Sequence, residues 1–225
     1  MTLPPRFNFA GHLFDLNRER AARPAYIDDR GTLSYGQLED RSRRLAAALQ
    51  AAGIRREERV LLLMLDGSDW PVSFLGSLYA GVVPVAVNTL LTSDDYAYML
   101  DHSRAQAALV SGALLPTLQE AMSRGGHEVR ALFVSQPTGA LPEGAQEFDA
   151  ALAAAEPLAS PVTTASDDPG FWLYSSGSTG KPKGTVHTHA NLWWTAELYG
   201  KPVLALTEDD VCFSAAKMYF AYGLG

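Results

Sequence analysis

Short apolar runs alternate with helical patterns between residues 60 and 135, and this alternation constrains the fold more than any other feature of the sequence. The apolar runs lie at residues 60–65, 82–87, 105–111 and 129–135, and the helical patterns at 68–80, 92–103 and 114–124. Strands buried on both faces are continuously apolar, and a helix is the usual connection between two parallel strands. We therefore predict an α/β fold with a mostly parallel sheet covered by helices on both faces.

The residues before this region predict a hairpin followed by a long helix. Residues 24–29 and 31–35 have the length and composition of two paired strands. Ser34 precedes Gln37 by three residues, which is the spacing of a helix capping box, and Gly53 is suited to end the helix.

The last third of the chain begins with a connecting segment. Residues 136–170 are rich in Pro, Ala, Gly and Ser, which is typical of a surface connection. Beyond it, the pattern predicts strands at 170–176 and 184–189, a helix at 190–200 and a further strand at 209–216.

Charge and cysteine content exclude several classes of protein. The net charge is −7, which does not favour nucleic-acid binding. Cys212 is the single cysteine, so an internal disulfide and a multi-cysteine metal site are excluded, and we predict that this residue is buried. The apolar runs are too short to span a membrane, and the N-terminus does not have the pattern of a signal peptide. These features favour a cytoplasmic protein.

A glycine-rich loop, YSSGSTGKPKG at residues 174–184, connects two of the predicted strands. Its glycines permit backbone conformations that other residues avoid, and they allow several N–H groups to point at one anion. Hydroxyl side chains add further donors, and Lys181 and Lys183 add positive charge. A strand followed by such a loop predicts a site for the phosphates of a nucleotide.

The loop differs from the Walker A motif, which has four residues between its glycines and a Ser or Thr directly after its lysine. Here Ser178 and Thr179 alone separate Gly177 from Gly180, and a proline follows Lys181. A surface loop of polar residues is the alternative to a phosphate site. All four lysines of the chain lie in its last quarter, so chance clustering is an alternative explanation for the two lysines in the loop.

The loop resembles the phosphate-binding signature of the AMP-forming acyl-adenylate enzymes, which include acyl-CoA synthetases, luciferases and peptide-synthetase adenylation domains. Residues 33–54 and 76–111 agree with this resemblance. Within the superfamily, residues 184–203 and 214–225 are most similar to the benzoate–CoA ligases. The resemblance covers nearly the whole chain.

This resemblance implies a reaction in two steps. A carboxylate attacks the α-phosphorus of ATP to give an acyl-adenylate and pyrophosphate, and the thiol of CoA then displaces AMP. The implied small molecules are an aromatic carboxylate, ATP, CoA and Mg²⁺. By match to the signature, the phosphate-binding residues are Ser175, Ser176, Gly177, Ser178, Thr179, Gly180 and Lys183. Lys181 stands at the variable position of the signature and carries less weight.

The segment MYFAYGLG at residues 218–225 is the second candidate site. Many relatives carry a histidine near here, beside the carboxylate substrate, and this chain has none. The resemblance implies that Phe220, Ala221, Tyr222 and Gly223 form the wall of a pocket for a flat ring. The alternative is that the aromatic residues of this segment belong to the core.

His187 and His189 are two residues apart and would share one face of a strand, an arrangement that can suit a metal ion. The sequence offers no third ligand close by. We therefore expect two structural histidines and no metal site.

The resemblance also implies how the chain divides. We expect residues 59–206 to form a complete α/β subdomain that carries the phosphate loop. Residues 1–58 would begin a second, incomplete α/β subdomain, and residues 207–225 would return into it. The adenine-, ribose- and Mg²⁺-binding segments and the catalytic lysine would lie beyond residue 225, so no catalytic residue is expected within the chain.

We therefore predict the N-terminal part of an ATP-dependent, AMP-forming benzoate–CoA ligase that is inactive by itself and self-associates through the incomplete subdomain. Three alternatives remain at this stage. The first is another acyl- or aryl-acid adenylating enzyme. The second is a stand-alone nucleotide-binding module without catalysis. The third is a kinase-like phosphotransferase, which would release ADP in place of AMP and pyrophosphate.

Overall fold

The structure is a computed structural model that describes residues 2–175 and 181–224. Its main sheet has seven strands, in the order β7 (Ala145–Glu147), β6 (Ala131–Ser135), β5 (Ala107–Ser111), β3 (Arg59–Leu63), β4 (Val83–Ala86), β8 (Pro169–Ser175) and β9 (Lys183–Thr188). Every neighbouring pair is parallel except β8 and β9, which form an antiparallel hairpin at one edge of the sheet. The predicted mostly parallel sheet is confirmed.

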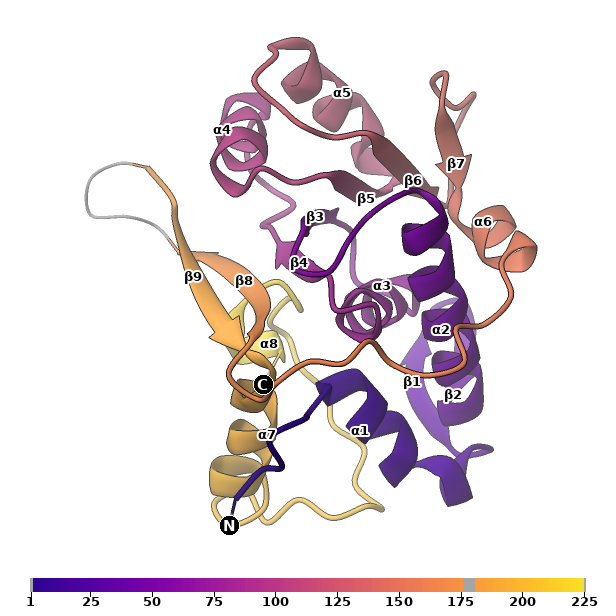
Figure 1. Ribbon diagram of the computed structural model, residues 1–225, viewed down its shortest axis with the longest axis vertical. Helices are drawn as coiled ribbons and strands as arrows, with labels where there is room; N and C mark the ends of the chain where they lie inside the picture. Colours follow the sequence, from indigo (N-terminus) through magenta and orange to yellow (C-terminus); the bar gives the residue numbers. More distant parts are fainter. Residues whose placement is uncertain (1, 176–180, 225) are drawn as a thin grey trace.

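Helices cover both faces of this sheet (Figure 1). α4 (Ser93–Ser103) and α5 (Leu115–Ser123) lie on one face, and α1 (Phe9–Leu16), α2 (Tyr35–Ala51), α3 (Asp69–Tyr79) and α6 (Phe148–Ala154) lie on the other. Side chains of β3 alternate between the two layers: Val60 and Leu62 pack with α2 and α3, whereas Leu61 and Leu63 pack with α4 and α5. The period of two along the strand thus builds two separate hydrophobic cores.

The helix starts predicted from the sequence are present. The hydroxyl of Ser34 accepts a hydrogen bond from the backbone N–H of Gln37, and the Gln37 side chain accepts one from the N–H of Ser34. Thr92 and Asp95 form an equivalent capping box at the start of α4. Since each box satisfies otherwise unpaired N–H groups, both helices begin at well-defined residues.

A hairpin precedes α2, also as predicted. β1 (Pro24–Asp28) and β2 (Gly31–Ser34) pair in antiparallel register. α2 then packs closely on α3, because Gly76 leaves room for the backbone of α2: a Cβ atom at Gly76 would lie 2.8 Å from the carbonyl oxygen of Ser42. Residues 35–51 therefore share a core with the main sheet in this structure, and the division into subdomains at residue 58 stays a prediction.

The C-terminal part contains α7 (His189–Thr195), a π-helical turn η3 (Ala196–Gly200) and the short α8 (Ala221–Leu224). Single 3₁₀ turns, η1 (Arg18–Arg20) and η2 (Gly112–Leu114), complete the helical elements of the described residues. Within residues 2–175 and 181–224, no helix combines the length and the hydrophobicity needed to cross a bilayer.

Two predictions for residues 209–216 are wrong. The segment forms no strand, and Cys212 is exposed rather than buried. Val211 is 84% exposed and Phe213 is 92% exposed, so this apolar segment lies on the surface. Its composition favours a strand, but a strand requires a neighbour for its backbone hydrogen bonds, and none of the described residues supplies one.

Candidate functional site

The glycine-rich loop leaves the sheet at the end of β8 and returns at the start of β9. Ser175 and Lys183 are direct partners in the antiparallel register and face each other across the hairpin. Of the predicted phosphate-binding residues, these two lie within the described structure. Ser176, Gly177, Ser178, Thr179 and Gly180 lie outside the described residues.

Gly184 on the second strand of the hairpin packs closely against the first strand. A Cβ atom at Gly184 would lie 3.2 Å from the ring of Trp172 on β8, closer than ordinary van der Waals contact. Tyr174 is the register partner of Gly184 on the other strand. The last glycine of the signature is therefore explained by close packing of the hairpin itself.

A cavity of about 680 Å³ lies beside the end of this hairpin that carries the loop. It is lined by Leu173, Tyr174 and Ser175 of β8, and also by Tyr219, Phe220 and Ala221 near the C-terminal end of the chain. Side chains of α4, including Met99, line another part of the cavity. The two stretches singled out from the sequence, the loop and the aromatic segment, thus meet at one cavity.

The predicted aryl-binding residues do not all have the same environment. Tyr219 is buried, and Phe220 is partly exposed at the cavity. Tyr222 is 82% exposed and lies outside the lining, as does Gly223. A Cβ atom at Gly223 would lie 2.2 Å from the carbonyl oxygen of Lys217, so this glycine is needed for the turn. The structure brings Phe220 and Ala221 to the cavity, but not Tyr222 or Gly223.

An aspartate beyond β3 holds the aromatic segment in place. Oδ1 of Asp66 accepts a hydrogen bond of 3.2 Å from the backbone N–H of Met218. Its other oxygen lies 3.3 Å from Nζ of Lys217. Sequence reasoning missed Asp66; the signal was an aspartate just past the carboxyl end of a buried parallel strand, where binding sites of α/β sheets form.

The two histidines differ in position and environment. His187 is on β9, where its ring stacks on Phe171 with centroids 4.6 Å apart, and burial lowers its pKa. His189 is the first residue of α7, so the two do not share one strand face as predicted. Its Nδ1 accepts a hydrogen bond from the N–H of Phe9, and burial lowers its pKa to about 4. In the part of the chain that the structure describes, no group of three or more potential ligands could hold a metal ion.

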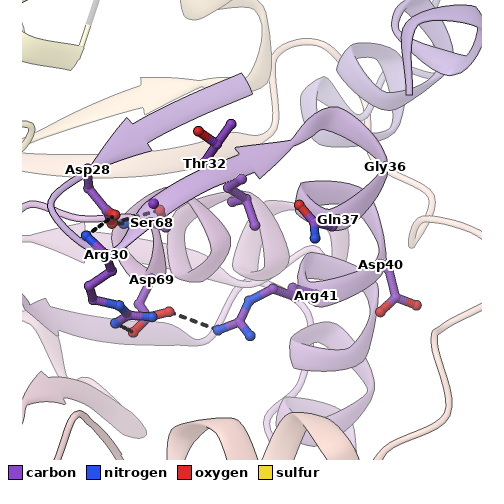
Figure 2. Close-up of a pocket in the computed structure, with 11 residues that line it drawn as sticks. Asp28, Arg30, Thr32, Gly36, Gln37, Asp40, Arg41, Ser68 and Asp69 are labelled. Atoms are coloured by element: carbon purple, nitrogen blue, oxygen red, sulfur yellow. Dashed lines mark hydrogen bonds and ion pairs between the residues drawn. The ribbon is translucent and has the colours of Figure 1, made fainter. Parts of the chain in front are cut away.

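A second cavity, of about 500 Å³, lies between the β1–β2 hairpin and the starts of α2 and α3. Figure 2 shows Arg30 and Arg41 pointing toward the carboxylate of Asp69, at 2.9 and 2.8 Å. The hydroxyl of Ser135 donates a further hydrogen bond of 2.7 Å to the same carboxylate. Burial alone would raise the pKa of Asp69, but the hydrogen bonds from Ser135 and Arg30 hold it below its ordinary value.

The position of the Asp69 network indicates a structural role. It joins the first hairpin, α2, α3 and the end of β6, and the buried carboxylate has a partner for each oxygen. Arg41 also pairs with Asp149 of α6, so the arginine is neutralised as well. A buried carboxylate whose two oxygens already have partners is better suited to stabilising the fold than to binding a ligand.

Comparison with known proteins identifies a family. The profile of the AMP-binding enzymes matches residues 14–225. A benzoate–CoA ligase of Thauera aromatica is 44% identical over 99% of this chain and 42% of its own length. A 4-hydroxybenzoate–CoA/benzoate–CoA ligase of Rhodopseudomonas palustris is 38% identical over 97% of this chain and 40% of its own length.

Solved structures agree with this result. The crystal structure of a benzoate CoA ligase from Burkholderia xenovorans LB400 superimposes with a TM-score of 0.89 at 55% sequence identity, covering 97% of this chain and 42% of that one. The chain therefore spans about two fifths of the length of the relatives that it matches.

Proposed function

The chain belongs to the family of AMP-binding enzymes, and from this premise we propose that it is the N-terminal part of an AMP-forming aryl-acid–CoA ligase that acts on benzoate. The observation that carries the proposal is the cavity at which the end of the glycine-rich loop meets Phe220 and Ala221. The lining of this cavity includes Ser175 and Phe220, which would suit a phosphate group and an aromatic ring respectively. A ligase that transfers AMP from ATP to an aromatic acid needs the two groups bound close together.

The reaction begins with bond exchange at the α-phosphorus of ATP. A carboxylate oxygen forms the new P–O bond as the bond to pyrophosphate breaks, which gives benzoyl-AMP and pyrophosphate. The sulfur of CoA then attacks the acyl carbon, and AMP leaves with the bonding electrons while the thiol proton is released. Both steps depend mainly on positioning and on neutralising the leaving group.

The residues of this chain contribute binding rather than covalent chemistry. Lys183 would neutralise charge on the β- and γ-phosphates, and the loop residues from Ser175 to Gly180 would donate hydrogen bonds to them. Phe220 and Ala221 would contact the aromatic ring. Mg²⁺ usually accompanies the phosphates of ATP and is held by few protein ligands. The described residues contain no group of three or more potential ligands that would fit it, and we assign no step to it.

The experiment uses the parent ligase, by which we mean the longer protein of which this chain would be the N-terminal part. Benzoate-dependent exchange of labelled pyrophosphate into ATP is expected, together with AMP as the nucleotide product once CoA is added. An acyl-adenylate that never transfers to CoA would favour another adenylating enzyme. Formation of ADP would instead favour a phosphotransferase.

The 225-residue chain itself is expected to have no ligase activity. Ordering of one loop offsets much of the energy of its phosphate contacts, so we expect ATP to bind no more tightly than roughly millimolar. A pyrophosphate-release assay and a calorimetric ATP titration test both statements. Benzoate-dependent turnover by the purified chain, or micromolar binding of ATP, would contradict them.

We further propose that the chain acts in the cytoplasm, where ATP and CoA are available, and that the isolated chain self-associates. Exposed apolar side chains are concentrated near its C-terminal end, including Val203, Val211 and Phe213. Sedimentation velocity over a range of concentrations measures this tendency. A strictly monomeric chain at all concentrations would contradict it.

A further inference from the structure

Two aromatic side chains of α4 contact both arms of the glycine-rich hairpin. Tyr98 and His102 are one helical turn apart, and their rings stack with centroids 5.3 Å apart. Residues of the same helix that point to the sheet, Tyr96 and Met99, are buried in the core beneath β3 and β4. With its capping box at Thr92 and these buried side chains, α4 is firmly packed on the sheet, which fixes the backbone positions of Tyr98 and His102.

The first contact is with the arm that enters the loop. Nδ1 of His102 lies 2.8 Å from Oη of Tyr174 on β8. Burial raises the pKa of Tyr174, so its side chain stays a neutral phenol at physiological pH. A phenol can donate to an unprotonated Nδ1 or accept from a protonated one, and the bond therefore survives in either tautomer of the imidazole.

The second contact is with the arm that leaves the loop. Oη of Tyr98 donates a hydrogen bond of 3.2 Å to the carbonyl oxygen of Pro182. Nζ of Lys181 lies 5.2 Å from the centroid of the same ring, within the range of a cation–π interaction. Lys181, at the variable position of the signature, thus contacts α4, whereas Lys183 pairs across the hairpin with Ser175.

Among the described residues, β8 is the main contact of β9, so few other contacts support the loop end of the hairpin. β9 is an edge strand whose neighbour in the sheet is β8, and Thr185 and Val186 on it are exposed. A loop that must present several donors to a phosphate chain loses affinity if its ends are free to separate, because binding must then order them. Contacts from one anchored helix to both arms reduce that cost.

We propose that Tyr98 and His102 are positioning residues that hold the two arms of the hairpin in the geometry needed to bind the nucleotide. The proposal rests on the function proposed above, since it gives these residues a part in binding ATP. It predicts that their loss loosens the hairpin locally and weakens ATP binding without changing the pocket for the ring.

The first test uses the 225-residue chain and needs no activity. Trypsin can cleave after Lys183, whereas the proline after Lys181 protects that bond. His102→Ala and Tyr98→Leu are expected to raise the rate of cleavage after Lys183 about fivefold or more, measured by mass spectrometry under native conditions. His102→Asn keeps a polar atom near the position of Nδ1 and should restore most of the protection. Asp101→Asn, at an exposed neighbouring position on α4, is the matched control and should change nothing.

The cleavage pattern separates the proposal from simple destabilisation. Faster cleavage confined to Lys183, with an unchanged urea midpoint, supports it. Unchanged cleavage at Lys183 would overturn it, and so would an equal increase at the arginine sites throughout the chain.

The second test uses the parent ligase and pyrophosphate exchange. Tyr98→Phe keeps the ring under Lys181 and removes the hydrogen bond to Pro182, so the KM for ATP should rise roughly threefold to tenfold while the KM for benzoate stays the same. Unaltered ATP kinetics in a variant with faster cleavage would overturn the role in nucleotide binding. If the parent ligase shows no adenylation activity, the proposed function is refuted. The cleavage experiment on the 225-residue chain still tests whether Tyr98 and His102 hold the hairpin.

Discussion

The backbone N–H of Met218 donates a hydrogen bond of 3.2 Å to Oδ1 of Asp66, which joins the aromatic segment near the C-terminal end to the loop after β3. Tyr219 follows directly and is buried at the cavity. Lys217 adds an ion pair to the same carboxylate, but its side chain is 56% exposed. Both links are exposed to solvent, but the backbone contact holds the chain itself, whereas the ion pair depends on a long flexible side chain.

We predict that Asp66→Ala in the parent ligase raises the KM for benzoate roughly threefold to tenfold, because the cavity wall loses the hydrogen bond that fixes it. The KM for ATP should change much less. Asp66→Asn retains an acceptor and should stay near the wild type, and Lys217→Ala should have little effect. Equal effects of all three variants on benzoate would contradict a role for the backbone contact.

The cavity that we propose for the aromatic ring can be tested by filling it. Ala221→Leu adds three carbon atoms at the cavity, so we expect the KM for benzoate to rise about tenfold or more, the scale of discrimination by a tight apolar pocket. Tyr222→Ala should have the smaller effect on benzoate, because Tyr222 is 82% exposed in this structure. Steady-state kinetics with benzoate and ATP varied separately provide the measurement. A larger effect of Tyr222→Ala would mean that Tyr222 turns into the pocket in the parent ligase.

Lys183→Ala should slow formation of the adenylate in the parent ligase. If, as proposed, this charge faces the departing pyrophosphate, its loss should cost on the order of 2–4 kcal/mol of activation free energy. Thioester formation from supplied benzoyl-AMP should be nearly normal, because pyrophosphate has already left. Quench-flow measurement of the two half-reactions tests this, with Lys181→Ala as the milder control. Equal losses in both half-reactions would argue against a phosphate contact.

Asp69→Ala should destabilise the chain by roughly 1–3 kcal/mol, because the buried hydroxyl of Ser135 and the guanidinium groups of Arg30 and Arg41 would lose their shared acceptor. The matched control is Asp40→Ala, which removes an exposed ion pair with Arg44 on α2 and should cost about 1 kcal/mol or less. Urea unfolding followed by circular dichroism measures both. A loss at Asp69 no larger than at Asp40 would show that the network contributes little.

His189 predicts a pH dependence of stability. Its pKa is about 4 in the folded chain and 6.5 in an unfolded one, so the unfolded chain binds more protons between these values. The free energy of unfolding should therefore rise with pH across this window, and His189 should contribute roughly 3 kcal/mol above pH 6.5 that is lost as the pH falls to 4.

Urea unfolding of the wild type and of His189→Asn at several pH values isolates this contribution. The variant is expected to be less stable at neutral pH and to show a flatter pH profile. His127→Gln, at a position away from α7, is the control and should keep the wild-type slope. An identical slope in His189→Asn would show that other groups cause the acid sensitivity.

Much of the fold followed from local patterns in the sequence. Continuous apolar runs such as Val60–Leu63 are typical of strands covered by helices on both faces, and the capping box at Ser34 predicts where one of those helices begins. The glycine-rich loop also predicts a phosphate-binding site from local sequence, because few other sites need this spacing of glycine, hydroxyl and lysine residues. These features depend on neighbours in the sequence, so no knowledge of distant contacts was needed.

Tertiary structure decided what the local patterns could not. Residues 209–216 have the composition of a strand, yet they remain unpaired because backbone hydrogen bonding depends on a partner from elsewhere in the chain. The position of Ser175 and Phe220 at one cavity depends likewise on how the elements pack. So do the contacts of Tyr98 and His102 with the two arms of the hairpin. The sequence by itself determined the family, the sheet and the loop. Which side chains surround that loop was decided by contacts between residues far apart along the chain, which periodicity and spacing do not record.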